Sequence, residues 1–180
     1  MILLDATAFA LLASPKSKPP TDPVTDQPVI RASDRFSWLE TVIQRNKDTI
    51  VIPTPALAEV LVGLEEDAPA ILQRISRSSW FKIVDFDTRA AVEVAAMTRE
   101  ALRANDKKAG STSSWQKVKI DRQIIAIARV MGVSQIYSDD GGVAKFAAQI
   151  GLPVIRSWEM PLPPDEVQQA SLFGDEVSEP

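Results

Sequence analysis

The sequence predicts an α/β fold in which helices cover both faces of a parallel sheet. Of its 180 residues, 45% are hydrophobic and 24% are charged, which is the composition of one soluble globular domain. A chain of this length can bury a core without disulfides, so the absence of cysteine is no obstacle to folding. Short apolar segments alternate with segments of helical periodicity, and this alternation is typical of parallel strands joined by crossover helices.

The first strand is expected at residues 1–4, which are wholly apolar and are followed by Asp5. Asp5 or Thr7 can cap the short helix that follows at residues 6–13. Further apolar stretches predict the other strands at 49–52, 80–85, 134–138 and 153–155. Apolar residues at helical spacing, preceded by capping residues or by an early proline, predict the other helices at about 33–45, 54–64, 68–77, 88–103, 117–131 and 142–150.

Residues 14–33 interrupt this alternation with five prolines and few large apolar side chains. Proline fixes φ and removes a backbone donor, so this stretch cannot form a helix or a central strand. We expect a proline-rich insertion loop at the surface. The domain is placed at residues 1–158, and residues 159–180 are expected to form an acidic C-terminal tail.

The formal net charge of −4 is unevenly distributed along the chain. Residues 157–180 carry six acidic and no basic residues, so the rest of the chain holds 20 basic against 18 acidic residues. Residues 103–122 carry six basic residues against two acidic ones. This stretch could therefore accept a polyanionic partner, although the overall charge is negative.

The composition also excludes whole classes of chemistry. Without His or Cys there can be no zinc finger, no haem ligand and no Ser-His-Asp or Cys-His nucleophile. A metal bound by the remaining oxygen ligands would be a hard ion such as Mg²⁺ or Mn²⁺. The N-terminal segment lacks the basic region of a signal peptide, and no stretch approaches the ~20 apolar residues that span a bilayer. We therefore expect a cytoplasmic protein.

Acidic residues follow two of the expected strands directly. Asp5 comes after the first strand, and Asp139 and Asp140 come after the fourth. The carboxyl ends of parallel strands meet at one edge of the sheet, where open α/β sheets bind their ligands. A single acid in such a place is commonly a helix N-cap or a turn residue. Two such positions at the same edge favour a site.

Two more acids lie on expected helices, and each allows two interpretations. Glu59 is the only charged residue between positions 50 and 64. It therefore needs a partner or a cation, unless it lies on the exposed strip opposite the apolar stripe. Asp121 borders the apolar face of its helix, although a carboxylate in a first turn also complements the helix dipole. Clustered carboxylates repel one another, and a divalent cation would offset that repulsion and could activate water against a phosphodiester.

Together these residues resemble the PIN-domain ribonucleases, which include the VapC-type toxins. The resemblance runs from residue 1 to about 163 and rests on four places: Asp5 after an apolar strand, Glu59 in TPALAEVLVG, Asp121 in DRQIIAIA, and the closing YSDD. It implies a three-layer α/β/α PIN-like fold with a five-stranded parallel sheet in the order 3-2-1-4-5. It also implies an acidic pocket that binds Mg²⁺ or Mn²⁺ and cuts RNA.

The resemblance also implies roles for single residues. The catalytic and metal-binding positions correspond to four acids: Asp5, Glu59, Asp121 and Asp140. Asp139 is the less favoured choice for the last acid, and Thr7 and Ser138 match supporting hydroxyl positions. Many family members carry a further acid where this chain has Gly142, which argues against a second metal site. The insertion at 14–33 is longer than in compact toxin members.

We therefore expect a metal-dependent endoribonuclease that cleaves single-stranded RNA with a metal-activated water, as the toxin of a toxin–antitoxin pair. A narrow acidic pocket admits one strand more readily than a duplex. Five basic residues are expected to guide the phosphate backbone: Lys107, Lys108, Lys117, Lys119 and Arg122. For any one of them, a solvated loop or helix start is an equally good explanation.

Two other functions fit part of the pattern. One is a PIN-like module that has lost activity and serves as a binding partner. The other is a phosphatase of the haloacid dehalogenase type, with Asp5 as nucleophile. Such an enzyme normally needs a second Asp where this chain has Thr7, and it leaves Glu59 unexplained.

Partners other than RNA are also expected. They are a cognate antitoxin and a second copy of the chain in a homodimer, with no membrane association. Residues 169–173, from Gln169 to Phe173, resemble the short peptide with which bacterial proteins dock on the replication sliding clamp. The alternative is an apolar anchor that folds back on the body or contacts an antitoxin.

Overall fold

The computed structural model describes residues 1–14, 16–108 and 110–164. Its main sheet has five parallel strands in the order β5-β4-β1-β6-β7. The strands are β1 (Ile2–Leu4), β4 (Ile50–Pro53), β5 (Phe81–Val84), β6 (Gln135–Tyr137) and β7 (Val154–Ile155). Numbered along the chain as the main strands, this is the expected order 3-2-1-4-5, so the predicted PIN-like sheet is confirmed.

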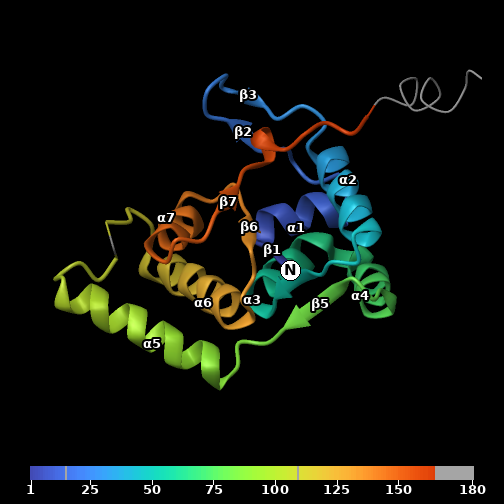
Figure 1. The fold of residues 1–180 in the computed structure, drawn as a ribbon. Helices are drawn as coiled ribbons and strands as arrows, with labels where there is room; N and C mark the ends of the chain where they lie inside the picture. The colour runs from blue at the N-terminus through green and yellow to red at the C-terminus, as the bar shows by residue number, and fades with distance from the viewer. Residues whose placement is uncertain (15, 109, 165–180) are drawn as a thin grey trace, which may run out of the picture.

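Helices cover both faces of the sheet and complete three layers (Figure 1). They are α1 (Ala6–Ala13), α2 (Ala32–Arg45), α3 (Thr54–Leu64), α4 (Ala68–Arg77), α5 (Thr88–Arg103), α6 (Trp115–Met131) and α7 (Gly141–Gln149). Side chains alternate along each strand, so Ile2 and Leu4 face one core while Leu3 faces the other. Helices α1 to α4 pack on one face of the sheet and form the first core with it. Helices α5 to α7 pack on the other face and form the second core, to which Ala56 of α3 also belongs.

Side-chain caps fix where several of the helices begin. Asp5 caps α1, Asp87 caps α5 and Asp140 caps α7, each by accepting backbone N–H groups of the first turn. Helix α6 begins at Trp115, two residues earlier than predicted, because the Ser114 hydroxyl accepts the N–H of Lys117 at 3.2 Å. None of the helices in the described ranges has both the length and the apolar character needed to cross a bilayer.

The proline-rich insertion differs from the expected loop. It contains a short antiparallel hairpin of β2 (Thr21–Asp22) and β3 (Gln27–Pro28), which Figure 1 shows standing away from the main sheet. The turn is closed by Asp22, whose carbonyl accepts the N–H of Asp26 at 2.8 Å and whose carboxylate accepts the N–H of Val24 at 2.8 Å. Proline is tolerated there because the pair is isolated and has open edges.

The body of the protein continues past β7. A short 3-10 turn, η2 (Ser157–Glu159), follows that strand, and Met160 is buried in the first core. The side chain of Arg35 on α2 donates a hydrogen bond to the carbonyl of Met160 and so holds this segment against the body. The expected clamp-like peptide at 169–173 and most of the acidic tail lie outside the described residues. The domain boundary at 158 stays a prediction.

Candidate active site

Asp5 lies at the end of β1, in the middle of the sheet, and its side chain is only 2% exposed. Its Oδ1 accepts the N–H of Ala8 at 2.8 Å, which caps α1. The Thr7 hydroxyl lies 3.0 Å from Oδ1 and 2.9 Å from Oδ2 of the same carboxylate. The Ser138 hydroxyl, at the end of β6, donates to Oδ2. The two predicted supporting hydroxyls therefore both contact Asp5.

Burial raises the pKa of Asp5 to about 6, since the charged carboxylate has lost its hydration. The hydrogen bonds from Ala8, Ser138 and Thr7 oppose this rise, and the nearby charge of Asp139 adds to it. Burying a charged carboxylate costs free energy unless a cation compensates its charge.

Asp121 lies in the second turn of α6 and is also only 2% exposed. Its Oδ2 is buried and accepts no hydrogen bond within the described part of the chain. This oxygen lies against the backbone of Gly142, where a Cβ would be 2.3 Å from it. Burial, followed by the charges of Asp140 and Glu59, raises the pKa of Asp121 to about 6. The helix dipole explains neither the missing partner nor the burial.

Asp140 is the N-cap of α7, and both of its carboxylate oxygens have partners. Its Oδ1 accepts the N–H groups of Gly142 and Val143, at 2.7 and 3.1 Å. Its Oδ2 lies 2.6 Å from the ammonium Nζ of Lys117, on the first turn of α6. Burial by itself would raise the pKa of Asp140, but the ion pair and the helix N–H groups lower it below the ordinary value. Asp140 therefore stays charged more easily than Asp5 or Asp121.

Glu59 lies on the exposed side of α3, as the alternative interpretation of this residue predicted. Its negative charge nevertheless acts on the pKa values of both Asp121 and Lys117. Glu59 therefore stands at the rim of an acidic group in which Asp121 and Asp140 meet beside Gly142, and Ser138 links Asp140 to Asp5. It also lines a hollow of about 470 Å³ between α1 and α3, together with Thr7.

Asp139 has a structural role in this fold. Its Oδ1 accepts the N–H of Ser157 at 2.8 Å, which ties the end of β6 to the turn after β7. Its Oδ2 is buried without a hydrogen-bond partner in the described chain, and its charge raises the pKa of Asp5. The preference for Asp140 over Asp139 as the last acid of the site stays a prediction.

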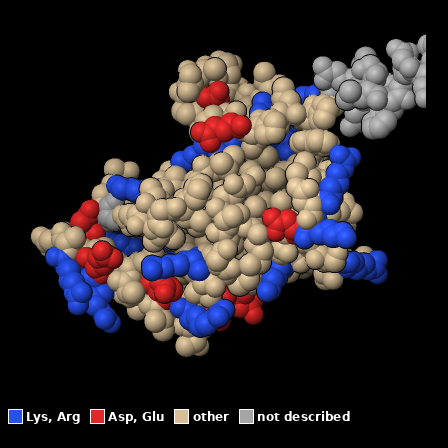
Figure 2. Space-filling model, in the orientation of Figure 1, with Lys and Arg blue, Asp and Glu red and all other residues tan. Residues whose placement is uncertain are grey.

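The expected RNA-binding residues divide into two groups. Lys107, Lys117 and Lys119 are exposed, and the ammonium of Lys107 lies 4.2 Å from the ring centroid of Trp115. Lys108 is half-buried and donates to the carbonyl of Ser113 at 2.8 Å. Acidic and basic side chains are interspersed over the face seen in Figure 2, which shows no large area of one sign.

Arg122 corrects the expectation that it contacts RNA, because its side chain is 1% exposed. Its guanidinium donates to the Thr98 hydroxyl at 3.2 Å and to the Lys107 carbonyl at 2.8 Å. It also lies over the rings of Trp115 and Phe146, at 5.6 and 5.2 Å from their centroids. Arg122 therefore joins α5, α6 and α7 and is closed to a phosphate backbone.

Sequence reasoning missed Arg156, which follows β7. Its guanidinium donates to the carbonyls of Ser138 and Asp140, at 2.8 and 3.1 Å, and so fixes the backbone that carries the last acid. Arg156 also lines a hollow of about 500 Å³ between the hairpin and the acidic group, with Trp158, Thr7 and Asp140. An Arg directly after the last strand is the only sequence signal, and taken alone it is weak.

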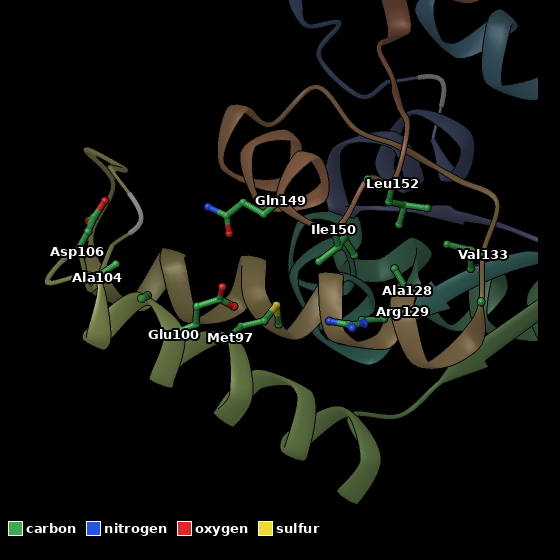
Figure 3. A pocket seen from close by; sticks show the side chains of 13 residues that line it. Met97, Glu100, Ala104, Asp106, Ala128, Arg129, Val133, Gln149, Ile150 and Leu152 are labelled. Atoms are coloured by element: carbon green, nitrogen blue, oxygen red, sulfur yellow. The ribbon is translucent and has the colours of Figure 1, made fainter.

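A larger hollow, of about 740 Å³, lies between α5, α6 and the end of α7 (Figure 3). Met97, Glu100, Arg129 and Ile150 are among its lining residues. None of the four predicted acids lines it. Size alone therefore does not locate the chemistry of this protein, and the acidic group at the strand ends remains the candidate site.

The donor set fits a hard divalent ion in its chemistry, because it offers carboxylate oxygens, one of them buried and unpartnered on Asp121. The side chains do not form a finished metal site. Within the described ranges, no group of three or more acidic side chains is arranged so that it could hold a metal ion as it stands. In the described part of the chain, the ammonium of Lys117 contacts Asp140 of this group.

Comparison with solved structures confirms the PIN-like fold. VapC20 of Mycobacterium tuberculosis, described as a toxin that cleaves the sarcin–ricin loop, matches with a TM-score of 0.55 at 16% identity, over 89% of this chain and all of that one. VapBC2 of Rickettsia felis, bound to a promoter DNA fragment, gives 0.54 at 15% identity, over 87% of this chain and 98% of that one. DNA-bound VapBC of Salmonella typhimurium gives 0.51 at 16% identity, over 87% and 97%. No family model matches the sequence, and no curated protein sequence matches it significantly.

Proposed function

We propose that this protein is a metal-dependent endoribonuclease that cleaves single-stranded RNA, and that it acts as the toxin of a toxin–antitoxin pair. The observation that carries the proposal is the buried, unpartnered Oδ2 of Asp121 beside Asp140. A buried carboxylate oxygen without a donor is a strong acceptor for a cation. The PIN-like fold and its similarity to a toxin described as cleaving the sarcin–ricin loop support the same proposal.

Asp121 and Asp140 would hold a Mg²⁺ or Mn²⁺ ion, with Glu59 contributing from the rim. Asp5 already accepts hydrogen bonds from Ala8, Thr7 and Ser138, which nearly fill its lone-pair positions, so we place it beside the ion as a source of negative charge or as a ligand through water. When bound, the ion would supply an activated water and stabilise charge on the oxygens of the phosphodiester.

The remaining residues prepare the site. Thr7 and Ser138 fix the orientation of the Asp5 carboxylate, and Arg156 fixes the backbone of Asp140. Gly142 leaves the space that the Asp121 carboxylate fills. Lys107 and Lys119 are exposed and would attract the phosphate backbone, whereas Lys117 already contacts an acid.

The proposal is tested with metal-free protein, a single-stranded RNA pool and added Mn²⁺. We expect cleavage that needs the ion and that falls at least ~100-fold in the variant Asp121→Asn. The variant Asp85→Asn removes an exposed carboxylate after β5 and serves as the matched control, with cleavage unchanged. Equal cleavage by wild type and Asp121→Asn would show that the acidic group is not the active site.

The inactive binding module is the second candidate, and one observation favours it. Lys117 already neutralises part of the acidic group, as a site without a metal would require. A module of this kind would not bind Mn²⁺ and would not cleave RNA. The phosphatase alternative is disfavoured because Asp5 is buried and its two oxygens already accept hydrogen bonds from three groups, which opposes nucleophilic attack by this carboxylate.

The antitoxin partner is proposed because two of the similar structures are VapBC complexes bound to DNA. Co-expression with the product of a neighbouring gene that encodes a small DNA-binding protein, followed by co-purification, tests it. The expected homodimer and the clamp contact of residues 169–173 stay predictions.

A further inference from the structure

Lys117 is placed where the acidic group needs a positive charge. Its ammonium lies 2.6 Å from Oδ2 of Asp140, and it stands one helical turn before Asp121 on the same side of α6. Partial burial by itself would lower the pKa of Lys117, but Asp140, Asp121 and Glu59 together raise it above its ordinary value. This lysine therefore interacts with three of the four acids of the candidate site.

The lysine satisfies the group only in part. One ammonium faces three carboxylates, those of Asp140, Asp121 and Glu59, and Oδ2 of Asp121 keeps no hydrogen-bond partner in the described chain. A strong negative field therefore remains at the site, and a doubly charged ion would meet it better than a single ammonium.

Lys117 is also free to move. Its side chain is 47% exposed, and the cap by Ser114 holds the backbone of this turn in place without involving the ammonium. A lysine side chain is a flexible four-carbon stem, so the ammonium can leave Asp140 while the helix stays where it is.

We propose that Lys117 serves as the resting counter-ion of the acidic site, that a divalent ion must displace it from Asp140 to bind, and that the released ammonium then contacts the RNA phosphate at the site. The inference rests on the proposed nuclease function and deepens it, because it gives one residue opposite effects on two steps. The lysine competes with metal binding, but it assists the binding and cleavage of RNA.

The test measures Mn²⁺ binding to metal-free protein without RNA, by calorimetry or by the loss of the free-ion electron paramagnetic resonance signal. The variant Lys117→Met keeps most of the length of the unbranched side chain and removes the charge. We expect it to bind Mn²⁺ about three- to tenfold more tightly than wild type, the size expected for a half-exposed ion pair together with repulsion between ammonium and metal. The variant Lys119→Met makes the same charge change two residues further along α6 and should leave the Mn²⁺ affinity within about twofold.

RNA cleavage at saturating Mn²⁺ supplies the second measurement. Lys117→Met should cleave at least ~10-fold more slowly than wild type, although it binds the ion more tightly. Circular dichroism establishes that each variant is folded. Tighter binding with slower cleavage supports the inference.

The failures of the two proposals can be told apart. If wild type binds Mn²⁺ and cleaves RNA, but Lys117→Met binds the ion equally or more weakly, the displacement inference is wrong and the nuclease proposal stands. If Lys117→Met binds Mn²⁺ and wild type does not, the lysine holds the site closed and the inference is supported. If neither protein binds Mn²⁺ nor cleaves RNA, both proposals fail.

Discussion

The raised pKa of Asp5 predicts an unusual dependence of stability on pH. In the unfolded chain this carboxyl titrates near 3.8, whereas burial in the folded protein raises its pKa to about 6. Between these two values the folded state binds the proton and the unfolded state releases it. The contribution of Asp5 to stability is therefore fully present below pH 3.8 and is lost as the pH rises through 6. A difference of this size corresponds to about 3 kcal/mol.

The variant Asp5→Asn removes this step while keeping the shape of the side chain. Its carbonyl oxygen can still accept the N–H of Ala8, and its amide can donate to the hydroxyls of Thr7 and Ser138, which then act as acceptors. Relative to wild type, we expect the variant to gain about 3 kcal/mol of stability between pH 4 and pH 8. This corresponds to about 6–12 °C in melting temperature for a chain of this size. RNA cleavage should be lost.

Urea unfolding at a series of pH values, in the presence of a chelator, measures this gain. Comparing the two proteins at each pH cancels the other titrating groups, and Asp85→Asn reports the effect of losing an exposed carboxylate. If the difference in unfolding free energy between Asp5→Asn and wild type is the same at pH 4 and pH 8, burial does not raise the pKa of the Asp5 carboxyl.

Two further substitutions test the packing around the site. Gly142→Ala should destabilise the protein by about 1–3 kcal/mol and weaken Mn²⁺ binding at least ~10-fold, because the added Cβ would lie 2.3 Å from Oδ2 of Asp121 and push this carboxylate out of position. Calorimetry measures both effects. Gly141→Ala is the control and should change neither, because its Cβ would meet no atom within 4 Å. Arg122→Met should lower stability by about 2–4 kcal/mol in urea unfolding, since it removes buried hydrogen bonds and ring contacts. A loss below ~0.5 kcal/mol would show that Arg122 does not hold the helices together.

The succession of elements could be predicted from local pattern. Helices α3 and α4 have the predicted bounds, because the proline near each start and the apolar spacing are purely local signals. The hairpin in the insertion was missed, since a two-residue pairing adds almost no pattern to a proline-rich segment. The strand order rested on the family resemblance, because alternation along the chain does not say which strands are neighbours.

The candidate site could be predicted in part. Asp5 and Asp140 follow strands, and any parallel sheet brings such residues to one edge, so their convergence needed only the topology. Arg122 was assigned wrongly because charge in a sequence normally indicates solvent. Helix α6 packs against α3, α5 and α7, so most of its circumference is covered, and the rings that receive Arg122 come from residues 115 and 146.

The sequence by itself determined the chemistry that is possible, since a chain with neither His nor Cys must work through carboxylates, hydroxyls and basic side chains. It also determined the strands of the main sheet and the helices that cover it, whose signals are local. The tertiary structure alone decided which charges meet. It joined Lys117 to Asp140, buried Arg122 and pressed Asp121 against Gly142, because each of these contacts depends on how separate elements pack and on the water that packing excludes.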